Sequence, residues 1–463
     1  MPESLRFVYR FITITLIILL VAACSGEEEA VPAPDNPPTD SEFEVVVFET
    51  EAPTNTPTAA EANKTPTPGA AIAGSGASST VSDQLGGDAN VSSDSETVSG
   101  GATNLDFSRP PDVNPLTGLK VDDPASLQRR PIMVRVGNDP AARPQVGLNQ
   151  ADIVYEEITE WWITRFTAIY LTEDPEMIAP IRSARLINLQ LVPQYQGALA
   201  NSGGSDGVRW ELSQTSIVNL DEFFVPQPYF YRENEGWQTR LAFDATEARD
   251  YLDEEGLDTD VGLRGFIFDD SPDLTKLPET TVGIANEVII PFPKSTSEAK
   301  WVYNADSGKY LRFTTGEPML AADGEQIAAS NVMIYFADHQ DTDIVEDSNG
   351  ATSIRIILNG RGAAWLLRDG SILKGNWETN GTETPNFIFD DGTPMPLKPG
   401  NTWVQVIPLE YAVDVDGVEQ DSLGAGADSV SDEEESDPES KPSPTLTPIG
   451  ARPSTPTPTK AAN

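Results

Sequence analysis

The sequence predicts an α+β protein in which an N-terminal α/β layered domain is followed by a β-rich domain of the barrel or sandwich type, with a disordered tail at each end. Two observations predict this class. Aromatic residues, apolar runs and turn signals continue from about residue 114 to residue 409, whereas Pro, Thr, Ser and acidic residues dominate both ends. Strand and helix patterns alternate in the first half of the folded region, and strand patterns fill the second half. We therefore predict two domains, at residues 113–275 and 286–412.

The N-terminus carries the features of a secretory signal peptide at residues 1–23. Arg6 and Arg10 precede an apolar stretch, Phe11–Ala23, that is shorter than a membrane span. The stretch ends in Val-Ala-Ala-Cys, which resembles the bacterial lipobox and implies cleavage before Cys24 and acylation of that residue, for example with palmitate. Two or three acyl chains anchor a protein durably. We expect a lipid-anchored protein on the extracytoplasmic face of the cell membrane; the alternative is an ordinary signal peptide with an incidental cysteine.

The two tails, at residues 24–112 and 413–463, are expected to be flexible spacers. They are rich in Pro, Thr, Ser and acidic residues, and they cannot bury enough apolar surface to offset the entropy lost on ordering. The whole chain has 30 Lys and Arg against 73 Asp and Glu, a net charge of -43. Nucleic-acid binding needs a basic surface, so this charge argues against it.

The first domain should alternate strands with helices. We predict strands at residues 130–136, 151–158, 163–171 and 198–200. Ser183 is expected to cap a helix that Pro193 helps to end, and Asp206 to cap a helix over Val208–Gln214. A further helix over Thr246–Leu252 is expected to close near Gly256.

The second domain should consist almost entirely of strands. Two pairs of strand patterns flank polar turns and predict hairpins, at 301–303 with 310–313 and at 363–367 with 372–377. Further strands are expected at 332–336, 353–358, 387–389 and 402–407. The boundary between the domains is expected between Asp270 and Asn286.

Several motifs in order carry a resemblance to a known family. They are NPLTG at 114–118, ARPQVGL at 142–148, ADIVYE at 151–156, ITRF at 163–166, PIRSAR at 180–185 and TWVQ at 402–405. This series is similar to the YerB-like lipoproteins of bacteria, and the likeness covers nearly all of residues 114–408. The resemblance implies a two-domain lipoprotein and no particular activity.

The chain departs from that family in two places. Family members tend to have His-Ala-Gly-Gly-Ser where this chain has Asn201-Ser202-Gly203-Gly204-Ser205, and Gly-Gly where it has Trp161-Trp162. The first departure removes a general base that a Ser-His-Asp hydrolase would need. His339 is the one remaining histidine, and we interpret it as a surface loop residue. We predict no metal site and no cofactor, since no His-Glu-x-x-His pair or Walker loop is present.

Arginines and carboxylates of the first domain form the main candidate site. The cluster comprises Arg143, Arg165, Arg182 and Arg185 with Asp152, Glu156 and Glu160. Guanidinium groups bind phosphate or carboxylate in a bidentate way, and a helix after Ser183 would add its positive end. The site could therefore hold a sugar phosphate, a pyrophosphate or a peptide carboxylate. The alternative is that these arginines pair with the acids across neighbouring strands and stabilise the sheet.

A second candidate lies at Asn201, Gly203 and Gly204. A glycine pair between a strand and a helix lets backbone N–H groups approach an anion, although a tight turn explains the same residues. Trp161, Trp162, Trp210 and Trp237 could stack on sugar rings, but tryptophans are more often core, and we expect that here.

Three hypotheses about function follow from these residues. The first is a surface lipoprotein that binds an anionic component of the cell envelope, a wall fragment or polymer, in an arginine-lined cleft. The second is an enzyme acting on a phosphate-bearing wall precursor, with Asp152 or Glu156 as base or metal ligand. The third is a protein-interaction module of the envelope, with a partner that the sequence does not identify.

Overall fold

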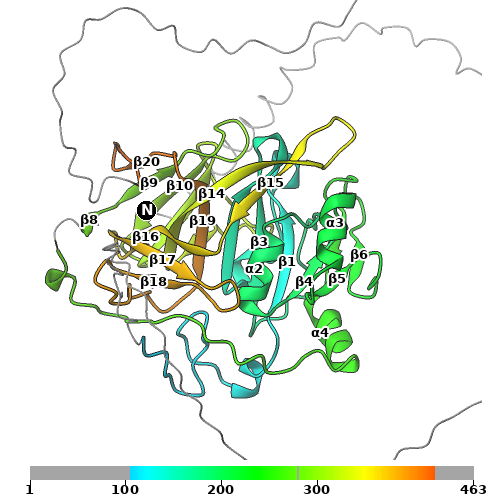
Figure 1. Ribbon diagram of the computed structural model, residues 1–463, viewed down its shortest axis with the longest axis horizontal. Helices are drawn as coiled ribbons and strands as arrows, with labels where there is room; N and C mark the ends of the chain where they lie inside the picture. Colours follow the sequence, from blue (N-terminus) through cyan, green and yellow to red (C-terminus); the bar gives the residue numbers. More distant parts are fainter. Residues whose placement is uncertain (1–104, 279–280, 423–463) are drawn as a thin grey trace, which may run out of the picture. The chain divides into compact units, whose positions relative to one another are not determined.

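The computed structural model describes residues 105–278 and 281–422, so the predicted signal peptide, Cys24 and most of both predicted tails lie outside the described residues. Within these ranges the strands form a 12-stranded sheet, a 7-stranded sheet and a two-stranded hairpin (Figure 1). The predicted class is confirmed: strands and a few helices make up the N-terminal half, and the C-terminal half is β-rich. No helix in the described part of the chain is long and apolar enough to cross a membrane.

The described part of the N-terminal half contributes one end of the large sheet and three α-helices. Its strands in this sheet are β1 (Ile132–Gly137), β2 (Ile153–Ile158), β3 (Thr164–Tyr170), β4 (Ala198–Asn201) and β5 (Val218–Asp221). The hairpin consists of β6 (Tyr229–Tyr231) and β7 (Leu241–Phe243). The helices are α2 (Asn188–Tyr195), α3 (Asp206–Ser213) and α4 (Ala245–Glu254).

The C-terminal half contributes the rest of the large sheet and the whole of the second. The strands that it adds to the large sheet are β8 (Val282–Ile284), β14 (Asn331–Val345), β15 (Thr352–Ile357), β16 (Gly360–Arg368), β17 (Ser371–Thr379), β18 (Asn386–Ile388) and β19 (Thr402–Pro408). The second sheet consists of β9 (Glu287–Ile290), β10 (Ala299–Asn304), β11 (Lys309–Thr314), β12 (Glu317–Pro318), β13 (Ala328–Ala329), β20 (Val413–Val415) and β21 (Val418–Gln420).

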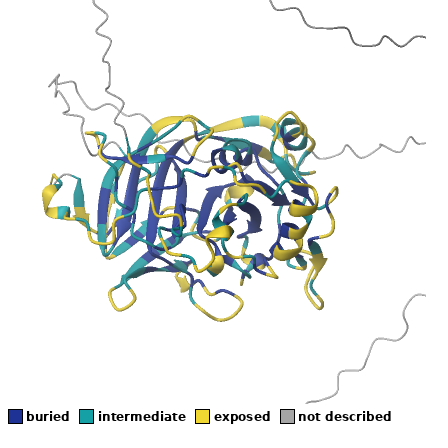
Figure 2. Cartoon of the chain, turned by 90° about the horizontal axis from the view of Figure 1, so that it is seen from below, coloured by how far each residue is buried: buried dark blue, intermediate teal, exposed yellow. Residues whose placement is uncertain are grey.

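One strand joins the two halves of the chain. Strand β19 lies between β14 and β2 and runs parallel to both, so the large sheet continues across the predicted domain boundary. Alternating residues of each central strand enter two cores, because successive side chains of a strand point to opposite faces. In β14, Val332 and Ile334 face the core that the second sheet and α4 cover, whereas Met333 and Tyr335 face the core that α2 and α3 cover. The central strands are accordingly buried on both faces (Figure 2).

The expected caps of two helices were wrong. Ser183 does not cap α2, which begins at Asn188; its hydroxyl donates instead to the Ser202 carbonyl, 3.0 Å away. Pro193 lies in the last turn of α2, which ends two residues later at Tyr195. Helix α3 is capped by Ser205, whose hydroxyl accepts from the Val208 N–H, because Asp206 already has helical backbone.

The folded region also extends beyond both ends that we expected for it. On the N-terminal side, the Arg109 guanidinium donates to the Leu263 carbonyl, 2.7 Å away, within the stretch assigned to the first tail. On the C-terminal side, β20 begins at Val413, where the second tail was expected to start. Val413 and Val415 are buried in the core beneath the second sheet, so their alternation with polar residues is that of a half-buried strand.

Candidate ligand-binding cleft

A cleft of about 710 Å³ lies where several strands of the large sheet end. Strands β1, β2, β4 and β5 run in the same direction, since β1 and β2 are both antiparallel to β3 and β4 is parallel to β1 and β5. Side chains that directly follow these strands line the cleft: Asp139 after β1, Glu160 after β2, Ser202 after β4 and Glu222 after β5. Ligand sites in sheets of parallel strands form at this edge, beyond the carboxyl ends of the strands.

Two further elements complete the walls. The β6–β7 hairpin contributes Tyr231, Trp237 and Arg240, and the loop after β14 contributes Asp347 and Asn349. The long β14–β15 hairpin reaches across the N-terminal half toward α3 (Figure 1), where Arg355 forms an ion pair with Glu211 at 2.7 Å. Both halves of the chain therefore contribute side chains to one cleft.

Glu160 neutralises two of the predicted arginines at the base of the cleft. Its Oε1 accepts from Arg165 Nη2 at 2.6 Å, its Oε2 accepts from Arg185 Nε at 2.7 Å, and Arg185 Nη2 donates to Oε1 as well. Burial alone would raise the pKa of Glu160, but the hydrogen bond from Arg185 and the two positive charges outweigh it and lower this pKa to about 2. Burial, reinforced by the charge of Arg185, lowers the pKa of Arg165 to about 9.

Arg182 is paired in a similar way. Its Nη2 lies 2.9 Å from Asp139 Oδ2, and its Nη1 donates to the carbonyl of Gln238 in the β6–β7 hairpin. This side chain thus links the loop after β1 to the hairpin. Of the predicted residues, Glu160, Arg165, Arg182 and Ser183 line the cleft, and Arg185 is held against it by Glu160.

Arg240, which the sequence analysis did not single out, differs from these arginines. Its guanidinium lies over the Tyr231 ring, 4.6 Å from the centroid, and within the described residues its side chain makes no hydrogen bond or ion pair. Tyr229-Phe230-Tyr231 and Leu241-Ala242-Phe243 flank a polar stretch that contains Gly236, and this hairpin signal could have drawn attention to the segment.

The aromatic side chains around the cleft are exposed, which corrects the expectation that these tryptophans are core. The exposed fractions are 58% for Trp161, 60% for Tyr231 and 78% for Trp237. Trp162 and Trp210 are also exposed but do not line the cleft. Trp161 is placed by the short turn between β2 and β3, in which the Thr159 N–H donates to the Ile163 carbonyl.

The remaining predicted site residues lie elsewhere. Arg143 donates to the side chain and carbonyl of Asn138 and to the Thr296 carbonyl, and burial lowers its pKa to about 10. Asp152 lies at the start of β2, at the opposite end from the cleft, where it accepts from Asn114 Nδ2 and the Leu171 N–H. Burial raises the pKa of Asp152 to about 6.

Glu156 is fully buried in a polar network inside the sheet sandwich. Its carboxylate forms an ion pair with Arg312 at 3.1 Å and accepts from Trp403 Nε1 and Gln405 Nε2, each at 3.1 Å. Its Oε1 also accepts from the Thr164 hydroxyl at 2.8 Å, so partners from both halves of the chain meet at Glu156. The arginine that pairs with Glu156 is Arg312, and none of the four arginines of the predicted cluster does so among the described residues. The enzyme hypothesis assigned Asp152 or Glu156 to the arginine cluster, and the structure does not bring either one to the cleft.

The glycine pair is next to the cleft but not in its lining. Asn201 is buried, and its Nδ2 donates to Asn219 Oδ1 at 2.7 Å. Gly203 has a φ of 68°, as a tight turn requires. Its carbonyl accepts from the N–H of Ala184. A Cβ at Gly203 or Gly204 would meet neighbours at ordinary distances of 3.4 Å or more.

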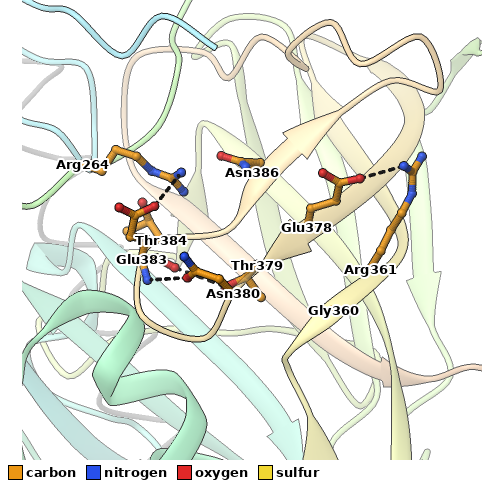
Figure 3. A pocket seen from close by; sticks show the side chains of 9 residues that line it. All are labelled: Arg264, Gly360, Arg361, Glu378, Thr379, Asn380, Glu383, Thr384 and Asn386. Atoms are coloured by element: carbon orange, nitrogen blue, oxygen red, sulfur yellow. Dashed lines mark hydrogen bonds and ion pairs between the residues drawn. The ribbon is translucent and has the colours of Figure 1, made fainter. Parts of the chain in front are cut away.

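A second, smaller pocket of about 340 Å³ lies beside β16 and β17 (Figure 3). Its charged residues are paired across it: Arg264 with Glu383 at 3.2 Å and Arg361 with Glu378 at 2.7 Å. In the described ranges no group of three or more His, Cys, Asp or Glu side chains is placed to hold a metal ion. His339 lies on β14, where its Nδ1 is 2.9 Å from the Ala337 carbonyl, and burial lowers its pKa.

Comparison with known proteins identifies the family. Residues 116–258 match the N-terminal domain, and residues 288–404 the C-terminal domain, of a family described as "Protein of unknown function (DUF3048)". The chain belongs to the DUF3048 family. A relative from Bacillus subtilis (strain 168), named "Putative lipoprotein YerB", is 27% identical over 301 residues, which span 64% of this chain and 86% of that protein.

A solved structure shows the same fold. The crystal structure of the YerB protein from Bacillus subtilis superposes with a TM-score of 0.55 and 24% identity, over 65% of this chain and 99% of that one. The name of the relative describes it as a lipoprotein and gives no ligand or activity. The family resemblance found in the sequence of this DUF3048 protein is therefore confirmed.

Proposed function

We propose that this DUF3048 protein is anchored to the extracytoplasmic face of the membrane through lipidated Cys24 and binds an anionic component of the cell envelope, a wall fragment or polymer, in the cleft at the strand ends. The lipobox-like Val-Ala-Ala-Cys sequence and the name of the Bacillus subtilis relative support the anchor. The position of the cleft, beyond the carboxyl ends of four parallel strands, supports the binding site.

One observation carries the preference for an anion. Of the three arginines that line the cleft in the described residues, Arg165 and Arg182 have carboxylate partners and Arg240 has none. An unpaired guanidinium at the rim presents its N–H donors to an incoming carboxylate or phosphate, which it can bind in a bidentate way. We therefore assign the main charged contact to Arg240 of the β6–β7 hairpin. The sequence analysis had favoured the arginines at the edge of the sheet.

Thermal unfolding with anionic wall components tests this proposal. The full-length protein in detergent would be heated alone and with pyrophosphate, muropeptides or teichoic acid fragments. A ligand present at about 100 times its dissociation constant should stabilise the folded state by about 2.7 kcal/mol. Arg240→Gln should abolish the shift, whereas Arg361→Gln, which changes an exposed arginine of the second pocket, should leave it unchanged. Either a panel without any shift or a shift that survives Arg240→Gln would contradict the proposal.

A further inference from the structure

The aromatic side chains of the cleft are held at their polar tips and exposed on their rings. Trp161 Nε1 donates to Asp347 Oδ2 at 2.8 Å, and the Tyr231 hydroxyl donates to Glu222 Oε1 at 3.1 Å. Each indole or phenol ring is thereby fixed in orientation, yet about 60% of each residue remains exposed. Trp237 adds a third exposed ring on the same cleft. Ordered, exposed rings around a cleft indicate a surface for contact with a ligand rather than a part of the core.

The backbone around Trp161 supports the same conclusion. Trp161 has a φ of 64° and Trp162 a φ of 55°, and this left-handed conformation is rare for bulky side chains. Both residues are strained relative to glycine, because the Cβ of an L-residue crowds the backbone in this conformation. Strain of this kind gathers at ligand sites, where the surrounding structure maintains it. The turn therefore keeps a tryptophan in the cleft at a position whose backbone favours glycine.

The polar groups of the cleft are mixed in sign and type. Ser183, Ser202, Gln238 and Asn349 offer hydroxyl and amide groups, and Asp139 and Glu222 offer carboxylates. Sugar hydroxyls both donate and accept hydrogen bonds, so they match a lining of this kind. Arg182 already neutralises Asp139, but Glu222 and Asp347 have no cationic partner in the described residues. A highly charged inorganic anion would meet these two carboxylates with a single unpaired cation, Arg240, to offset them.

We propose that the ligand of the cleft is an acidic saccharide whose sugar rings stack on Trp161 and Trp237 and whose carboxylate or phosphate substituent binds Arg240, which lies over the Tyr231 ring. The electropositive C–H groups of a sugar ring pack on the negative face of an aromatic ring, and the guanidinium takes the charged substituent. This inference rests on the proposed function and specifies the chemical class of its ligand.

Three probes separate the parts of such a ligand. A muropeptide carries sugar rings and carboxylates, its free stem peptide carries carboxylates without rings, and di-N-acetylchitobiose carries rings without charge. Calorimetry on the full-length protein in detergent should show the muropeptide binding at least about tenfold more tightly than either part. Trp237→Ala should weaken muropeptide binding about tenfold, and Trp210→Ala, a matched exposed tryptophan outside the cleft, should not change it.

The outcomes distinguish this inference from the proposed function. If the stem peptide binds as tightly as the muropeptide and Trp237→Ala has no effect while Arg240→Gln abolishes binding, the cleft binds an anion but the saccharide inference is wrong. If no probe binds here and the wider anion panel also gives no thermal shift, both proposals fail. Both also fail if Arg240→Gln leaves muropeptide binding intact. Because Trp237 is 78% exposed, its replacement should not unfold the protein, and an unchanged unfolding midpoint would verify this.

Discussion

Replacing Glu160 by glutamine tests the electrostatics at the base of the cleft. The substitution keeps the size of the side chain and removes the negative charge that Arg165 and Arg185 share. Glu160 is 7% exposed, so the two guanidinium groups would be left close together and largely shielded from water. Removal of one partner from a buried ion pair costs about 3 to 5 kcal/mol, because the remaining charge is left without compensation.

The pKa of Glu160 gives a second value for the stability that this carboxylate contributes. A decrease from 4.5 to about 2 on folding corresponds to about 3 kcal/mol of stability. Because the folded-state pKa is the lower one, this stability is present above pH 4.5 and is lost as the pH falls toward about 2. The two approaches agree on a loss of about 3 kcal/mol at neutral pH.

Urea unfolding at neutral and acid pH provides the assay. Glu160→Gln should reduce the free energy of unfolding by about 3 kcal/mol at neutral pH and by about 1 kcal/mol near pH 3, since protonation of the unfolded state already weakens the wild type there. The folded variant should also bind pyrophosphate more tightly than the wild type, because Arg165 has lost its carboxylate partner and Arg185 keeps only Glu346, 3.4 Å away. A loss below about 1 kcal/mol at neutral pH would refute the shared ion pair.

Three further predictions concern other parts of the chain. Trp162→Gly should be about 1 kcal/mol more stable to urea than Trp162→Ala, because the φ of 55° favours glycine; equal stability would show that the turn is not strained. Burial raises the pKa of Asp152 from 3.8 to about 6, so this residue stabilises the fold fully below pH 3.8 and loses that contribution as the pH rises through about 6. Relative to Asp152→Asn, the wild type should therefore lose about 3 kcal/mol over this interval in pH-dependent unfolding, and parallel profiles would contradict the prediction. Finally, Cys24→Ser should abolish metabolic labelling with palmitate; labelling that persists would place the lipid on another residue.

The sequence predicted the strands better than their arrangement. Strands such as Ile132–Gly137 and Thr402–Pro408 are continuous apolar or alternating runs bounded by turn residues, and such local patterns are readable from one sequence. The parallel pairing of β19 with β2 joins residues about 250 positions apart, and no local signal specifies it. The start of α2 was misplaced because Ser183 is a good cap in isolation, but its hydroxyl is engaged by the neighbouring segment at Ser202.

The candidate site was predicted only in part, because it too depends on contacts between segments that are distant in the sequence. Arg165, Arg182 and Ser183 do line one cleft. Arg165 lies at the start of β3, and Arg182 and Ser183 follow Ile181, which forms a β-bridge to Val136 near the end of β1. The sequence could not show that Glu160 would pair with both Arg165 and Arg185. This pairing depends on the short turn between β2 and β3, which places the Glu160 side chain beside both guanidinium groups. Arg240 was missed because the β6–β7 strands have three residues each, too short for a clear alternating pattern.

Quenching of tryptophan fluorescence tests most directly whether a ligand occupies the aromatic cleft. Among the eight tryptophans, Trp161, Trp162, Trp210 and Trp237 are exposed. In the double variant Trp162→Phe/Trp210→Phe, the tryptophans open to acrylamide would be the two that line the cleft. We expect saturating muropeptide to suppress this quenching, because the sugar rings would cover both indoles. Unchanged quenching at a concentration where calorimetry shows full binding would contradict the account, since the ligand would then bind elsewhere.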